Sequence, residues 1–179
     1  TNGGMEETDR LETLTIETTD AGDLSLDFFG ISSDFIDDAG QLEEIYIKAS
    51  VNGNIYVGDI GAAEEANELR NINIMSAGAD IFVGIIDGDD DGNSDGASVS
   101  EVNIHADDDA EIYVEEIDVE DIATMTILTE DDSVVDVVLI DMDVHGGTLT
   151  VSGDGLLAWM NFADEAFVVM DFTGLTEPQ

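Results

Sequence analysis

The expected fold follows from residues 69–83, which read LRNINIMSAGADIFV. Apolar and polar side chains alternate through Ile72 and Ile74, and again through Ile81 and Val83. Alternation over about four to six residues with many β-branched side chains is typical of a half-buried strand. The intervening Ser-Ala-Gly-Ala-Asp is typical of a turn. The segment therefore predicts two short strands that are joined by a tight corner.

The same two-part unit recurs along the chain. Its first part, an apolar residue followed by x-x-apolar-x-apolar, begins at Leu11, Leu42, Leu69, Val99 and Ile122. Its second part begins at Leu24, Ile55, Ile81, Ile112 and Val135. The spacing between the two parts is nearly constant, whereas the return to the next copy varies in length. One fixed and one variable connection are what stacked repeats require.

These repeats predict an all-β fold, a parallel β-solenoid (β-helix) of about six irregular coils. The solenoid would span residues 11–162, after a polar N-terminal segment at 1–10. Residues 163–179 would form a C-terminal cap or an assembly segment. The alternative fold is an antiparallel β-sandwich, which also accepts many short strands but does not require a repeat at double spacing.

Composition narrows the possible partners. The 179 residues include 44 Asp and Glu but only 3 Lys and Arg, and the formal net charge is −41. Nucleic acid is excluded as a partner because phosphate binding needs clustered cations. No apolar run is long enough for a transmembrane segment. So much like charge should destabilise the folded chain unless salt or divalent cations compensate.

The repeat phrases LETLTIETTDAGDLSLDFFG, beginning at Leu11, and LEEIYIKASVNGNIYVGDI, beginning at Leu42, resemble those of large secreted bacterial surface proteins. These are calcium-dependent S-layer proteins and RTX-type adhesins, in which right-handed parallel β-helices stack such coils. The resemblance covers roughly residues 11–162 but lacks the tandem RTX nonapeptide. It implies a right-handed solenoid, an extracellular or cell-surface location and a structural role.

An acidic loop predicts a calcium site. Residues 87–95 fit the pattern D-x-D-x-D-G-x-x-D, in which alternating oxygen ligands surround a cation and glycine permits the sharp bend. The twelfth position of the pattern holds Ser98, where a bidentate glutamate is usual. The expected Ca²⁺ ligands are Asp87, Asp89, Asp91, Asn93 and Asp95.

Two tight corners are also acidic. Stacked corners would lie about 5 Å apart, so their charges either bind a second cation or remain solvated and screened by salt. The residues concerned are Asp107, Asp108, Asp109, Asp131 and Asp132. The two histidines, His105 and His145, are expected to be ordinary surface residues, because no cysteine or second nearby histidine completes a transition-metal site.

The predicted function is that of an extracellular structural protein, such as an S-layer, filament or adhesin module, and not of an enzyme. Its expected partners are further copies of itself, assembled with calcium, and cell-surface polysaccharide. One alternative is a carbohydrate-active β-helix enzyme, but Tyr46, Tyr56 and Tyr113 read as isolated aromatics rather than a sugar platform. The other alternative is a soluble halophile protein whose acidity is an adaptation to salt.

Overall fold

The computed structural model describes residues 12–18, 24–26, 34–36, 42–50, 53–61, 69–87, 98–142, 146–162, 167 and 169–175. The strands in these residues are β1 (Thr13–Glu17), β2 (Leu24–Leu26), β3 (Asp34–Ile36), β4 (Glu44–Ser50), β5 (Ile55–Val57), β6 (Asp59–Gly61), β7 (Asn71–Ala77), β8 (Ile81–Asp87), β9 (Ser98–Asp107), β10 (Glu111–Val119), β11 (Asp121–Thr129), β12 (Val134–Met142), β13 (Thr148–Gly153), β14 (Leu156–Phe162) and β15 (Val169–Leu175). The described ranges contain no helix, and hence no helical membrane span.

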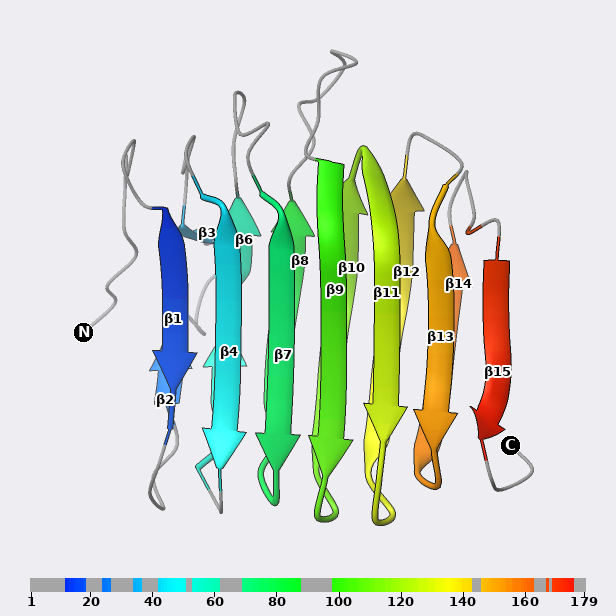
Figure 1. Ribbon diagram of the computed structural model, residues 1–179. Coiled ribbons are helices and arrows are strands. Elements are labelled where there is room, and N and C mark those ends of the chain that lie inside the picture. The colour runs from blue at the N-terminus through cyan, green and yellow to red at the C-terminus, as the bar shows by residue number, and fades with distance from the viewer. Residues whose placement is uncertain are drawn as a thin grey trace.

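The strands form two sheets that face each other (Figure 1). The seven-stranded sheet has the order β1-β4-β7-β9-β11-β13-β15. The eight-stranded sheet has the order β14-β12-β10-β8-β5-β2, with β3 and β6 beside this path. Every strand pair in the described ranges is parallel. From β7 onward the chain alternates between the sheets, whose strands point in opposite directions.

Equivalent positions of successive repeats pair on neighbouring strands. In the seven-stranded sheet, the ladder runs through Leu14, Ile45, Ile72, Val102 and Met125. In the eight-stranded sheet, it runs through Leu26, Val57, Val83, Val114 and Val137. Each repeat therefore places equivalent apolar residues on neighbouring strands, as the spacing predicts.

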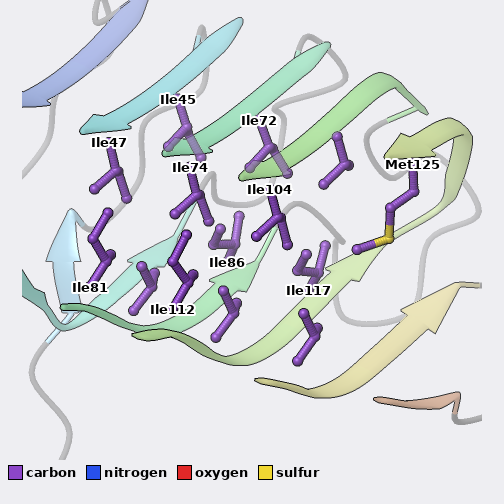
Figure 2. Close-up of a cluster of buried hydrophobic side chains, with 14 of the residues drawn as sticks. Ile45, Ile47, Ile72, Ile74, Ile81, Ile86, Ile104, Ile112, Ile117 and Met125 are labelled. Carbon is purple, nitrogen blue, oxygen red and sulfur yellow. The ribbon is translucent and has the colours of Figure 1, made fainter. Parts of the chain in front are cut away.

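The core lies between the two sheets. Buried and half-buried residues alternate without interruption along β4 and β7, so each strand turns one row of side chains inward. Figure 2 shows isoleucines of one sheet, such as Ile74, pointing toward those of the other, such as Ile112. Both of these side chains are fully buried. Each burial of this kind contributes about 1.5–3 kcal/mol, so the isoleucine rows provide the main stabilisation of the stack.

The prediction of a right-handed β-solenoid of about six coils is wrong. The strands lie in two flat, open sheets, one with seven strands and one with eight, and the sheets do not close. The alternative, an antiparallel sandwich, is also wrong because the pairing is parallel. Apolar spacing determines which residues pair on neighbouring strands, but it does not determine whether the sheets close. We call the observed arrangement the two-sheet stack.

Candidate metal centre

Two acidic turns connect the sheets at the lower edge of Figure 1. In the first turn, which joins β9 to β10, the Ala110 amide donates to the Asp107 carbonyl over 3.3 Å. Its two central residues, Asp108 and Asp109, have positive φ values of 56° and 62°. Two consecutive left-handed residues are typical of type I′ turns, which favour Asn, Asp and Gly. Aspartate in both places is therefore compatible with the turn and leaves two carboxylates near its tip.

The second turn, which joins β11 to β12, repeats this geometry. The Ser133 amide donates to the Glu130 carbonyl over 3.0 Å, and Asp131 and Asp132 have φ values of 46° and 59°. The Ser133 hydroxyl is buried and donates to the Ala106 carbonyl of the first turn's strand over 2.7 Å. The two acidic turns are therefore held together by a buried hydrogen bond.

The turns stack because the strands that lead into them are paired. Ala106 pairs with Thr129, and Thr129 pairs with Gly153, which leads into the third turn. The Asp131 amide donates to the Asp154 carboxylate of that third turn over 3.1 Å. We call this set of carboxylates the acidic turn column. It consists of Asp107, Asp108, Asp109, Glu130, Asp131, Asp132 and Asp154.

The third turn follows Gly153, a position where the close approach of two strands requires glycine. Gly153 has a φ of 113°, and a Cβ at this position would lie 1.8 Å from the Thr129 carbonyl oxygen. Any larger residue would therefore push β13 away from β11. The close approach of the two backbones brings Asp154 within hydrogen-bonding distance of the second turn.

Three carboxylates of the acidic turn column converge. Ligand oxygens of Asp107, Asp108 and Asp131 all lie within 4.8 Å of one another. The negative charge of Asp107 is the largest cause that raises the pKa of Asp131, followed by desolvation and by the charges of Asp154, Asp108 and Glu130. Several oxygen ligands at this spacing suit a hard cation such as Ca²⁺.

Lysine and arginine do not compensate these charges. The chain has only Arg10, Lys48 and Arg70, so no lysine or arginine follows residue 70 in the sequence. Lys48 lies 3.5 Å from Glu17, which places this ammonium group at the β1 end of the two-sheet stack. The acidic turn column therefore depends on histidine or on cations from solution for its counter-charge.

A histidine lies beside the column. His105 Nε2 is 2.9 Å from Glu130 Oε2, and a ligand oxygen of Asp107 lies within 4.8 Å of both. The interpretation of His105 as an ordinary surface residue missed this contact. The relevant signals were the i, i+2 spacing of His105 and Asp107, which places both side chains on one face, and the pairing of their strand with the one that ends at Glu130.

The structure describes only some of the predicted metal ligands, and it places those differently. Asp107, Asp108 and Asp131 are brought together, whereas Asp109 and Asp132 occupy the second left-handed position of each turn and belong to neither converging group. Of the predicted calcium loop, only Asp87 is described. The other expected ligands, Asp89, Asp91, Asn93 and Asp95, lie outside the described residues, so that loop stays a prediction.

Asp87 belongs to a second row of carboxylates that sequence reasoning missed. It pairs with Asp118, which in turn pairs with Asp141, on three neighbouring strands of the eight-stranded sheet. Burial is the main cause that raises the pKa of nearby Glu116, and the charges of Asp141, Asp87 and Glu115 raise it further. Like charge therefore accumulates on the outer face of this sheet as well as at the turns.

Two of the three tyrosines, Tyr56 and Tyr113, are not isolated, contrary to the sequence-based expectation. Tyr56 and Phe82 stack with ring centroids 5.0 Å apart and planes within 2°, and Tyr113 lies 6.3 Å beyond Phe82. Tyr56 and Phe82 each cover one ring face of the other, so the two covered faces are not available for stacking on a sugar. The next residue in the row, Asp136, has a buried carboxylate oxygen without a partner, and desolvation raises its pKa.

Comparisons with known proteins found no matching family model, no matching curated protein and no matching solved structure. The resemblance to secreted bacterial surface proteins therefore stays a prediction.

Proposed function

We propose that this chain is a structural, self-assembling module of an extracellular layer or cell surface, and that calcium stabilises its folded state. The observation that carries the proposal is the acidic turn column, in which carboxylates of stacked turns converge with no lysine or arginine after Arg70 to balance them. A cation bound between Asp107, Asp108 and Asp131 would replace repulsion between neighbouring turns by a bridge. The folded state would then depend on the supply of divalent ions.

The ligand group predicts which substitutions weaken calcium binding. Asp131→Asn should raise the Kd for Ca²⁺ about tenfold, because Kd values vary over decades with the charge of the ligands. Asparagine is tolerated in left-handed turn positions, so the fold should be retained. Isothermal titration calorimetry with CaCl₂ at fixed ionic strength measures the change.

Asp132→Asn is the matched control, because it removes the same charge from the same turn but lies outside the converging group. It should change the Kd much less than Asp131→Asn does. Equal effects of the two substitutions would show that only the general charge matters. In that case the acidic turn column is a salt-screened surface, as expected of a halophile protein, and the specific calcium site is wrong.

The β15 end of the two-sheet stack supports self-assembly. Four large apolar side chains are exposed there, Leu156, Val169, Met170 and Phe172, at 41–51% of their surface. An open pocket of about 340 Å³ includes Phe172 and is also lined by Leu157, Ala158, Met160 and Phe162. In a chain with a net charge of −41, an apolar end is the surface where contact between copies meets least repulsion.

Strand direction supports one way in which a second copy would dock. β15 and β1 are the outermost strands of the seven-stranded sheet, and all strands of this sheet run parallel. The β1 edge of a second copy could therefore extend the ladder beyond β15 with unchanged direction. An open strand edge favours such addition, and a head-to-tail contact of this kind generates filaments rather than closed dimers.

Val169→Lys should reduce this association, because a charge would then lie at the exposed edge strand. Multi-angle light scattering in millimolar CaCl₂ should show large species for the wild type and mainly monomers for the variant. Thr124→Lys is the matched control, since Thr124 lies in the same row of the seven-stranded sheet, two strands inward, and is exposed. Wild-type protein that stays monomeric at high concentration would contradict self-assembly.

A further inference from the structure

We propose that His105, Asp107 and Glu130 bind a divalent transition-metal ion, with Zn²⁺ as the first candidate, at a site adjacent to the calcium ligands. The inference rests on the proposed cation-binding role of the acidic turn column, because Asp107 belongs to both groups. It adds a second kind of ion, which is selected by a nitrogen ligand that the calcium group lacks.

The backbone holds the three side chains in place. His105 and Asp107 are two residues apart on β9, so they project from the same face of the seven-stranded sheet. The Glu130 amide donates to the Ala106 carbonyl over 2.9 Å, which fixes Glu130 between them on the neighbouring chain segment. The three ligand atoms converge within 4.8 Å without any change in the backbone.

The separation of His105 and Glu130 fits coordination by one ion. The 2.9 Å between His105 Nε2 and Glu130 Oε2 is close to the separation of two ligands at right angles around an ion. For a tetrahedral Zn²⁺ site with bonds of about 2.0–2.1 Å, that separation would be about 3.3 Å. Both side chains are more than one third exposed, so small changes of their torsion angles can adjust the separation of the ligand atoms. Exposure on one side also leaves room for water in the remaining coordination positions.

The surroundings of His105 are compatible with a transition-metal ion. His105 pairs with Met75 on one side and Leu128 on the other, so its neighbours within the row are apolar. Its polar partners are therefore the carboxylates at the end of the strands. Imidazole together with carboxylate oxygen suits Zn²⁺ and related ions, whereas Ca²⁺ takes oxygen ligands. Asp108 and Asp131, beside this group, add negative potential that attracts cations.

The test uses the two histidines of the full chain. We expect the wild type and His145→Asn to bind Zn²⁺ with the same Kd, and His105→Asn to bind at least about tenfold more weakly, as loss of a ligand should cause. Co²⁺ reports the site independently, because its visible absorption intensifies on four- or five-coordinate binding and should be lost in His105→Asn. Glu130→Gln is a second variant with the same expected loss. Unchanged Zn²⁺ binding in both His105→Asn and Glu130→Gln would overturn the inference.

Calcium titrations of the same variants separate this inference from the proposed function. His105→Asn should retain Ca²⁺ binding, and Asp131→Asn should retain Zn²⁺ binding. If calcium binds as expected but the zinc result fails, only this inference is wrong. If zinc binds as expected but calcium has no effect, only the proposed calcium site is wrong. Circular dichroism of each variant confirms that the fold is retained, so a loss of binding is not a loss of structure.

Discussion

Replacing Ile72 by aspartate is expected to unfold the protein. Ile72 is fully buried in the seven-stranded sheet, and its ladder partners Ile45 and Val102 are fully buried as well. The substitution removes about 1.5–3 kcal/mol of apolar burial. It also places an unpaired charge in the core, which costs about 3–5 kcal/mol more. Since domains are stable by only about 5–15 kcal/mol, the cooperative unfolding transition should disappear.

Asn73→Asp is the matched control, one residue further along β7. Asn73 is half-buried and points outward, and its side-chain oxygen accepts a hydrogen bond from Asn103 over 3.1 Å. Aspartate keeps an acceptor oxygen in this position, so stability should fall by no more than about 1 kcal/mol. Urea unfolding followed by circular dichroism, in CaCl₂ and again in molar KCl, measures both variants. An Ile72→Asp protein with a wild-type transition would show that the described register is wrong.

Millimolar Ca²⁺ is expected to raise the melting temperature far more than an equal ionic strength of KCl at neutral pH. One site with ligand at a hundredfold excess over Kd adds about 2.7 kcal/mol. For a chain of this length, each kcal/mol raises the melting temperature by about 2–4 °C. Scanning calorimetry at constant ionic strength, with CaCl₂ or with EGTA, measures the difference. A response to ionic strength alone would favour the halophile interpretation.

Acidification should stabilise the calcium-free protein and reduce the effect of calcium. The folded-state pKa values of Asp131, Glu116 and Asp136 are raised, so these groups bind protons more readily in the folded protein. Their stabilising contribution is complete below the ordinary values of 3.8 and 4.5 and is lost as the pH rises through the raised pKa values. In EGTA, stability should therefore increase as the pH falls from neutrality toward this range. The calcium effect should shrink over the same interval, because Ca²⁺ needs ionised ligands.

The core could be predicted from the sequence, whereas the sheet arrangement could not. Equivalent positions such as Ile45, Ile72 and Val102 repeat in register, and parallel pairing follows from that repetition. The spacing does not determine whether the sheets close, and the predicted solenoid was wrong. Tyr56, Phe82 and Tyr113 hold the same outward position in successive repeats, so the register places them in one row. The stack of Tyr56 on Phe82 was missed because the tyrosines were considered one at a time.

The candidate metal centre was only partly predictable for a related reason. Acidic corners could be expected to stack once the repeat was found, and Asp107, Asp108 and Asp131 do converge. The contact of His105 with Glu130 depends on side-chain direction and on the register between two strands that are far apart in the sequence. A motif search within one loop detects the segment at residues 87–95 but not a site assembled from separate turns.

The two edges of the two-sheet stack differ in how much the lengths of their connecting segments vary. On the lower edge of Figure 1, the turns between β9 and β10 and between β11 and β12 share one geometry. On the opposite edge, the connection from one repeat to the next ranges from the single residue Glu120 to residues 88–97. Strand register is unaffected by this range, since β7 and β9 pair along the whole of β7 although residues 88–97 lie between β8 and β9 in the sequence. Insertions and deletions in such a chain can therefore accumulate along one edge, where new peptide sequences could be displayed while the core and the acidic turn column stay unchanged.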